Sequence, residues 1–309
     1  MNRLHTTTSA DSAMRLATLR ILVGVYALVY LAARFVYFWK FADLPATQFA
    51  PVFFMRAFDA PWSEAAYRGL FLALFPLGIA FVAGIRFEYT GRLFSLGLLA
   101  VLTYTNSWGT ILHTDNLLCL HALVLGFSPS ADSLSWPIDD HNEASTDSAA
   151  YLWPIKTMAI LCVATYFLAG IAKLKIAGLT FIEGENLRNH VALAAVRKTE
   201  LGSVSSPIGV WMLHHTGVFG ALAALSLLFE LAAPFALVNE RLGKVWSFGA
   251  WMFHFGVLLT MAIGFFYPLS FIAFAPFFRV ELLAERYGYR FRKRALNAPQ
   301  TPPTTNPPA

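Results

Sequence analysis

Residues 166–175 read Tyr-Phe-Leu-Ala-Gly-Ile-Ala-Lys-Leu-Lys, and they close an apolar run of about 20 residues, the length of helix that crosses a bilayer. Lys173 lies near the end of this run. A charged side chain near hydrocarbon costs roughly 3 kcal/mol or more, so it is a functional hypothesis by default. The stretch therefore predicts a membrane-spanning helix with a functional lysine.

The composition of the whole chain indicates the same class of protein. Of the 309 residues, 57% are hydrophobic and 13% are charged, which is about half the charged share of a soluble domain. The basic residues cluster before the first apolar run and after the last one. Such clusters set membrane orientation and do not indicate a nucleic-acid partner. We therefore expect an all-α, polytopic integral membrane protein whose main partner is the lipid bilayer.

The apolar runs predict about eight membrane helices, two of them short or re-entrant, together with interfacial helices. The predicted spans are residues 16–39, 65–83, 93–112, a short run ending at 127, 152–174, 211–238, 245–266 and a short run at 269–283. An even number of crossings puts both termini on one side. The basic residues at each end place that side in the cytoplasm.

One membrane domain is expected over residues 14–285. It lies between a disordered segment, 1–13, and a basic, then proline-rich disordered tail, 286–309. Within the domain, residues 128–150 are expected to form a solvated acidic loop. Residues 176–207 are amphipathic, so at least one interfacial helix is expected there.

Two arginines lie inside the first predicted span. Arg20 and Arg34 are fourteen residues apart, nearly four helical turns, so they share one helix face. That face is expected to look into the bundle and line a cavity. The alternative is that the two side chains snorkel to opposite interfaces.

A polar cluster opens the short fourth helix. His113 and Asn116 are three residues apart and share a helix face, whereas His121 is turned away from His113 by about 80°. Two interpretations stay open. These side chains either line a cavity and orient a substrate, or they are hydrogen-bonded packing groups at the entrance of a span.

The later spans carry further polar groups. Tyr166, Gly170 and Lys173 recur at intervals of four and three residues, so a phenol, a small-residue notch and an amine share one helix face. Glu230 lies too far inside the sixth span to reach water, so it must be protonated, paired or facing a wet cavity. His254 lies inside the seventh span.

The chemistry of this polar set has two interpretations. An apolar site disfavours the charged form of a lysine, which leaves a neutral amine that can act as a base on a lipid-soluble substrate. Alternatively, a Lys–Glu or Arg–Glu pair simply holds helices together. The chain shows no phosphate loop, zinc motif or Ser-His-Asp elbow, and its two cysteines lack metal-site spacing, so no metal is predicted.

Several stretches resemble one known family. The segment from Tyr166 to Leu174, followed by Phe-Ile-Glu-Gly-Glu-Asn-Leu, is similar to the Ala-Gly-x-x-Lys-Leu and acidic-Gly segments of the vitamin K-dependent gamma-carboxylases and the bacterial horizontally transferred transmembrane family. The His-Thr-Asp-Asn stretch, Phe-Glu-Leu-Ala-Ala-Pro around Glu230, and His254 with Ile-Gly-Phe-Phe after it also look like that family. The resemblance covers roughly residues 15 to 280.

The resemblance implies a carboxylase-like enzyme that uses a reduced, vitamin K-like quinone with oxygen and carbon dioxide. In the carboxylases, the lysine matching Lys173 deprotonates reduced vitamin K. Oxygen then gives a strongly basic alkoxide that abstracts a proton from a protein-bound glutamate, carbon dioxide adds, and the quinone epoxide is released. His113 and Glu230 match polar positions and take supporting catalytic roles. The expected cavity-lining residues are Tyr166, Gly170, Asn116, His254, Arg20 and Arg34.

The chain also departs from the family pattern. The animal enzymes have a large extracytoplasmic region after the membrane bundle that contributes to substrate recognition, and this chain instead resembles a bacterial short form. Bacterial relatives include proteins implicated in maturing secreted peptides. Two functions therefore stay open: a quinol-dependent membrane enzyme that modifies a secreted peptide or small protein, or a non-enzymatic membrane factor in its maturation or export. Transport is a weaker third possibility, since no inverted repeat is evident.

Overall fold

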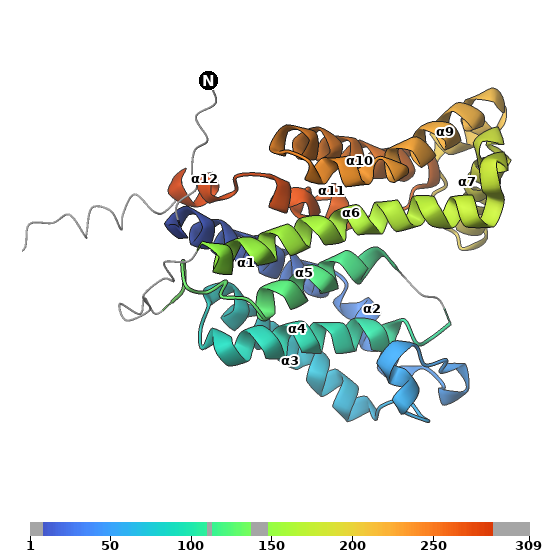
Figure 1. The fold of residues 1–309 in the computed structure, drawn as a ribbon. Helices are drawn as coiled ribbons and strands as arrows, with labels where there is room; N and C mark the ends of the chain where they lie inside the picture. Colours follow the sequence, from blue (N-terminus) through green and yellow to red (C-terminus); the bar gives the residue numbers. More distant parts are fainter. Residues whose placement is uncertain (1–8, 110–112, 137–147, 287–309) are drawn as a thin grey trace, which may run out of the picture.

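The computed structural model describes residues 9–109, 113–136 and 148–286, and all regular secondary structure in these ranges is helical (Figure 1). The all-α class predicted from the sequence is confirmed for this part of the chain. The α-helices are α1 (Ser9–Ala33), α2 (Phe35–Trp39), α3 (Glu64–Ala83), α4 (Phe87–Thr105), α5 (Asn116–Gly126), α6 (Ala149–Ala177), α7 (Glu185–Glu200), α8 (Pro207–Leu213), α9 (Gly217–Leu231), α10 (Glu240–Met261), α11 (Phe266–Leu269) and α12 (Glu281–Ala284). The 3-10 helices are η1 (Lys40–Asp43), η2 (Ala46–Gln48), η3 (Phe53–Ala57), η4 (His113–Asp115), η5 (Gly178–Glu183), η6 (Ala233–Leu237) and η7 (Ile272–Phe277).

Three helical segments are long and apolar enough to cross a membrane: α1, α3, and the continuous segment Ala149–Glu183 that contains α6. A fourth crossing is obtained if α8 and α9, which are bent by 114° at a short break, form one broken span. The described helices therefore provide three or four candidate spans, fewer than the eight predicted. α4 and α10 are of similar length, but each has charged residues in its first turns.

α6 runs the length of the molecule and joins its two halves (Figure 1). One side of α6 contacts α1 and α5, and the other contacts α9 and the 3-10 helices η6 and η7. α1 packs in turn against α3 and α5. Because α1 and α6 are apolar on nearly all sides, they fit a central position, where both faces meet other helices.

The bounds of α3 follow from its capping residues. The Ser63 hydroxyl accepts a hydrogen bond from the Ala66 amide at the first turn, and this satisfies one of the backbone donors that a helix start leaves unpaired. The helix ends at Gly84, whose φ of 75° is left-handed, a conformation that glycine adopts without steric cost. The predicted second span, 65–83, thus agrees with the structure.

The sixth predicted span, 211–238, is not one helix. α8 stops before the exposed polar run 214–216, and the chain then turns sharply into α9. α9 ends at Leu231, and Pro234 follows in the 3-10 helix η6. Proline cannot donate the backbone hydrogen bond that would continue an α-helix. Apolar composition alone did not indicate these two interruptions.

The predicted eighth helix, 269–283, is also divided. Phe271 has a φ of 68°, and the chain continues as the 3-10 helix η7 with Pro276 inside it, followed by the short helix α12. A positive φ at a non-glycine residue ends regular helix geometry. The apolar run is therefore a compact irregular segment that packs against α6 and α10.

The ends of the predicted domain differ in detail. α1 begins at Ser9, so residues 9–13, which were expected to be disordered, are helical. α1 ends at Ala33, and Arg34 separates it from α2. The predicted disordered residues 1–8, the part of the acidic loop at 137–147, and the tail residues 287–309 lie outside the described residues.

The amphipathic segment 176–207 contains the helix α7, as predicted. Figure 1 shows α7 standing across the end of α6. Such a crossing is the arrangement expected of a helix that lies along a membrane surface when its neighbour crosses the bilayer. The interfacial location itself stays a prediction.

Candidate functional site

The polar groups of α6 lie on the face that meets α9 and α10. Tyr166 and Gly170 are buried there, and Lys173 is half-buried. Tyr166 contacts His254 of α10, and Lys173 contacts Glu230 of α9. Five of the predicted site residues are thus brought together by three helices.

Lys173 and Glu230 form an ion pair between α6 and α9. The Lys173 Nζ donates to both carboxylate oxygens of Glu230, at 2.6 and 2.7 Å. The Lys173 side chain is 27% exposed, whereas the Glu230 side chain is 4% exposed. The amine therefore lies between a buried carboxylate and the outer surface of the helices.

Aromatic rings border this ion pair. The Lys173 Nζ lies 5.2 Å from the centroid of Phe181 and 5.9 Å from that of Phe253. These are cation–π distances, and such contacts stabilise an ammonium ion that has lost part of its water. The pair is therefore set in an aromatic, largely apolar border.

Gly170 permits the close approach that places Glu230 beside the lysine. A Cβ atom at Gly170 would lie 3.1 Å from the Cβ of Glu230 and 3.1 Å from a side-chain carbon of Leu231. Small residues at such points let two helices pack closely. The glycine predicted as a notch therefore faces the helix that carries the carboxylate.

Tyr166 and His254 form a second polar pair, next to the first along α6. The Tyr166 Oη and His254 Nε2 are 2.7 Å apart and buried. The Tyr166 ring packs edge-on against Trp246, with ring centroids 5.0 Å apart, and the His254 ring packs against Phe265 at 4.8 Å. Aromatic neighbours thus hold both groups in place away from water.

A separate cavity of about 340 Å³ lies between α1, η4 and the chain around α11. Its lining residues are Tyr26, Tyr30, Arg34, Thr114, Asp115, Gly264, Phe266 and Tyr267. Arg34, one of the predicted cavity-lining residues, is in this set. Neither Lys173 nor Glu230 lines it.

A hydrogen-bonded network forms one wall of this cavity. The Arg34 Nη1 donates to the Tyr30 Oη at 2.5 Å, and the Tyr30 hydroxyl donates to the Asp115 Oδ2 at 2.7 Å. The Thr114 hydroxyl donates to the other oxygen of Asp115 at 3.1 Å. The Arg34 guanidinium also stacks over the Tyr37 ring at 4.0 Å. Positive and negative charge are thus bridged by one tyrosine hydroxyl.

A third polar pair lies beside the cavity. The His121 Nδ1 is 2.7 Å from the Tyr267 Oη, and its Nε2 is 3.2 Å from the Met158 carbonyl oxygen. Cys162 lies next to this ring, with its Sγ 3.6 Å from Nε2 and 3.0 Å from the Ala273 carbonyl oxygen. His121 is therefore a fully bonded core histidine, in agreement with the packing alternative left open by the sequence.

Arg20, expected to line a cavity, binds three backbone carbonyl oxygens. Its side chain is fully buried, and it donates to the backbone carbonyls of Ser130 at 2.7 Å, Leu134 at 2.6 Å and Val82 at 3.3 Å. It lines neither of the two cavities described here. Arg20 and Arg34 also do not share a helix, because α1 ends at Ala33. Their expected shared face stays a prediction, since the Arg34 N–H still donates to the Tyr30 carbonyl oxygen at 3.1 Å, which is the i to i−4 bond of a helix.

Asn116 and His113 are two further residues predicted for the site. Asn116 is exposed at the start of α5 and does not line either cavity described here. The backbone of His113 begins η4, but its side chain lies outside the described part of the structure. Sequence analysis missed Tyr30, Asp115 and Tyr267. Asp115 lies within the quoted His-Thr-Asp-Asn stretch, and Tyr30 lies one turn before Arg34, so both had a usable signal.

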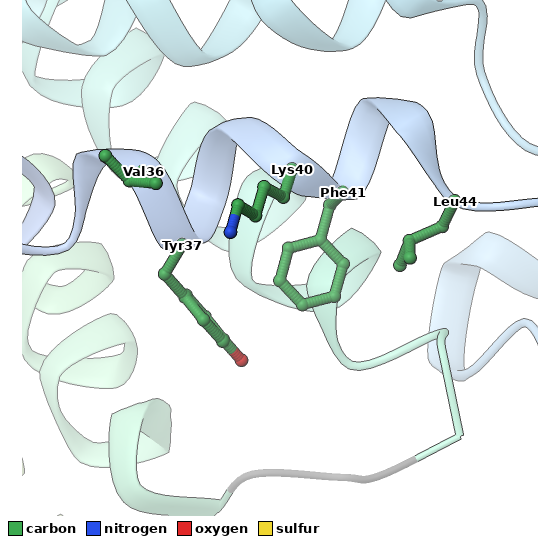
Figure 2. Close-up of a pocket in the computed structure, with 5 residues that line it drawn as sticks. All are labelled: Val36, Tyr37, Lys40, Phe41 and Leu44. Atoms are coloured by element: carbon green, nitrogen blue, oxygen red, sulfur yellow. The ribbon is translucent and has the colours of Figure 1, made fainter.

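A second, shallow hollow of about 450 Å³ lies along α2 and η1. Figure 2 shows its lining residues, Val36, Tyr37, Lys40, Phe41 and Leu44, which come from one continuous stretch. Its walls are mainly apolar, and Lys40 supplies its one charged group. This hollow lacks the paired acid and base groups of the other sites.

No protein-family model, curated protein or solved structure matches the chain. Within the described residues, no group of three or more His, Cys, Asp and Glu side chains is placed to hold a metal ion. The fold thus defines an all-helical protein with several apolar helices, compatible with a membrane protein.

Proposed function

We propose that this chain is a bacterial inner-membrane enzyme that acts on a lipid-soluble substrate, a reduced quinone, with Lys173 as its acid–base group. One observation carries the proposal. The Lys173 side chain is 27% exposed, and the side chain of its partner Glu230 is 4% exposed. A molecule arriving from outside the helices meets the amine first, with Glu230 behind it.

The ion pair supplies the chemistry of this site. Removing two opposite charges from water costs solvation energy, and moving the proton from Lys173 to Glu230 removes both charges at once. Lys173 is then a neutral amine that accepts a proton from a substrate hydroxyl, and Glu230 holds the proton that the amine gave up. General bases of this kind contribute about 100- to 10,000-fold to rate.

The residues around Lys173 fit an aromatic substrate. Phe181 and Phe253 border the amine, and aromatic faces favour the stacking of a planar ring. Oxidation of a bound reduced quinone by oxygen would supply the strong base that takes a proton from a glutamate of a secreted peptide, and carbon dioxide would supply the new carboxyl group. The part of this chain in that reaction is to hold the ring and take its hydroxyl proton.

The test uses the full chain reconstituted in lipid nanodiscs with reduced menaquinone and oxygen. We expect oxygen-dependent consumption of the quinol, and we expect Lys173→Ala to reduce its rate at least 100-fold, because the base is lost. The matched control is Lys175→Ala, an exposed lysine two residues further along the same helix. An unchanged rate in Lys173→Ala, or no quinol consumption by the wild-type chain, contradicts the proposal.

A second candidate function is favoured by the two-oxygen contact between Lys173 and Glu230, which is also the geometry of a clasp between helices. The chain would then be a non-enzymatic membrane factor in the maturation or export of a secreted peptide. A charge swap, Lys173→Glu with Glu230→Lys, restores an ion pair between the two helices but moves the amine from α6 to α9, where it can no longer act as the base. Recovery of peptide secretion by the swap supports this second function, and loss of secretion in the swap supports the enzyme.

The proposed orientation places both termini in the cytoplasm, which requires an even number of crossings. The broken pair α8 and α9 decides between three and four of the candidate spans. Green fluorescent protein fused to either end of the chain fluoresces only on the cytoplasmic side. We expect both fusions to fluoresce, and a dark fusion at one end would show an odd number of crossings.

A further inference from the structure

We propose that the cavity between α1, η4 and residues 264–267 binds a zwitterion that has a primary ammonium group and an anionic group. The inference is independent of the Lys173 site, because none of the residues that line the cavity belongs to that ion pair. Three features of the cavity lining support it: the direction of the hydrogen bonds made by its hydroxyl groups, the opposite charges of Arg34 and Asp115, and its aromatic rings.

The Tyr267 hydroxyl donates its hydrogen bond to His121. The Met158 carbonyl oxygen can only accept a hydrogen bond, so His121 Nε2, at 3.2 Å, carries a proton. In the neutral ring, Nδ1 is then an acceptor, and the Tyr267 hydroxyl at 2.7 Å donates to it. The Tyr267 oxygen is left with lone pairs, so it can accept a hydrogen bond from a ligand.

The hydroxyls of Tyr30 and Thr114 also act as donors within the wall. Both hydroxyls donate to the carboxylate of Asp115, at 2.7 and 3.1 Å. An ionised carboxylate is an acceptor alone. This wall of the cavity thus presents acceptors and a negative charge, which match a ligand group that carries several N–H donors. A primary ammonium has three such donors.

Arg34 supplies the opposite charge on the same wall. It donates to the Tyr30 hydroxyl, and a guanidinium has further N–H donors for a carboxylate or phosphate. A simple cation would be repelled by Arg34, and a simple anion by Asp115. The single tyrosine hydroxyl between the two charges sets them two hydrogen bonds apart, a spacing that suits the two charges of one small zwitterion.

Aromatic rings complete the enclosure. Tyr26 packs against Tyr267 with ring centroids 4.9 Å apart and stacks on Tyr30 at 6.1 Å, and Phe266 also lines the cavity. Ring faces near a carboxylate attract an ammonium ion by cation–π interaction. The cavity volume of about 340 Å³ is near the lower limit for small-molecule sites, which suits a small zwitterion.

Two sources share this chemistry: a free amino acid, and the ethanolamine headgroup of a phospholipid. The soluble arm of the test titrates L-leucine and O-phosphoethanolamine into the detergent-purified full chain by calorimetry. The lipid arm compares the melting temperature of the chain in nanodiscs with phosphatidylethanolamine and with phosphatidylcholine. Saturable leucine binding identifies an amino acid as the source, and a higher melting temperature in phosphatidylethanolamine identifies the lipid headgroup.

The variants Asp115→Asn and Arg34→Met remove one charge each, and we expect each to weaken binding at least tenfold. The matched controls, Asp59→Asn and Arg56→Met, change exposed residues outside the cavity and should leave binding unchanged. Tyr267→Phe, which removes one acceptor at nearly constant volume, is a second variant in case Asp115→Asn does not fold.

Two results would overturn the proposal. The first is the absence of binding in the soluble arm together with equal melting temperatures in phosphatidylethanolamine and phosphatidylcholine, because a trimethylammonium group has no N–H donors and would not need a wall of acceptors. The second is wild-type affinity in the folded charge variants or in Tyr267→Phe.

Discussion

The amine of Lys173 contacts both carboxylate oxygens of Glu230, at 2.6 and 2.7 Å, yet the two side chains differ in exposure, at 27% and 4%. A buried ion pair is stable only while both partners are present, since the remaining charge is otherwise left without compensation. Because the two side chains differ in exposure, we expect removal of one partner to cost more stability than removal of the other.

We expect Lys173→Met to destabilise the protein more than Glu230→Gln does. Removing the lysine leaves a buried carboxylate, at a cost of about 3 to 5 kcal/mol. Removing the charge of Glu230 leaves a lysine that still reaches the surface, so the loss is smaller. The measurement is thermal unfolding of the detergent-purified protein, followed by tryptophan fluorescence.

Lys175→Met is the control for the lysine substitution, because Lys175 is exposed on the same helix. It should leave the melting temperature nearly unchanged. A larger loss in Glu230→Gln than in Lys173→Met would contradict the asymmetry of the pair.

Gly184 should be far less tolerant of alanine than Gly178. Both have positive φ. Gly184 is left-handed, at φ 86° and ψ −7°, and Gly178 lies at φ 60° and ψ −152°, a region essentially restricted to glycine, so both substitutions strain the backbone, by about 1 to 3 kcal/mol. A Cβ at Gly184 would also overlap the backbone of Phe219 and Gly220 in α9, whereas nothing lies within 4 Å of a Cβ at Gly178.

The expected result is loss of folded protein in Gly184→Ala and a lower melting temperature with folded protein retained in Gly178→Ala, measured by size-exclusion chromatography and thermal unfolding. Similar behaviour of the two variants would show that α9 does not rest on the backbone at Gly184.

Arg20→Met should destabilise the contact between α1 and the segment 130–134. The buried guanidinium donates to three backbone carbonyls, and hydrogen bonds to charged groups contribute about 1.5 to 3 kcal/mol each. Arg20→Lys should not restore stability, because an ammonium is a compact point charge and lacks the planar fork that reaches separated acceptors.

Limited proteolysis is the measurement for the Arg20 variants. We expect the 130–134 segment to be cleaved faster in Arg20→Met and Arg20→Lys than in the wild-type protein. Arg56→Met, at an exposed position, is the control. Full protection of that segment in Arg20→Met would exclude a stabilising role for the guanidinium.

Tyr166→Phe should cost about 1 to 3 kcal/mol of stability, because it removes the buried hydroxyl bonded to His254 at almost constant volume. Tyr89→Phe is the control, since the Tyr89 side chain is 62% exposed. Chemical denaturation in detergent measures both. Equal stability of the two variants would show that the Tyr166–His254 contact contributes nothing to the fold.

The sequence indicated part of the site and missed part of it. The spacing of Tyr166, Gly170 and Lys173 put three groups on one helix face because the helical period is fixed. It could not identify their partners, since Glu230 and His254 lie 57 and 88 residues away from Lys173 and Tyr166 along the chain. The sequence also did not indicate that α1 ends at Ala33, one residue before Arg34.

The all-α class and the long apolar helices can be predicted from the sequence, because these follow from composition and from the local geometry of the backbone. The packing of the whole chain set where apolar runs break, as at 214–216 between α8 and α9. It also decided which charges pair, because ion pairs and cavity walls join residues that are distant in the chain and close only after packing. Tyr30, Arg34 and Asp115 form one wall for that reason.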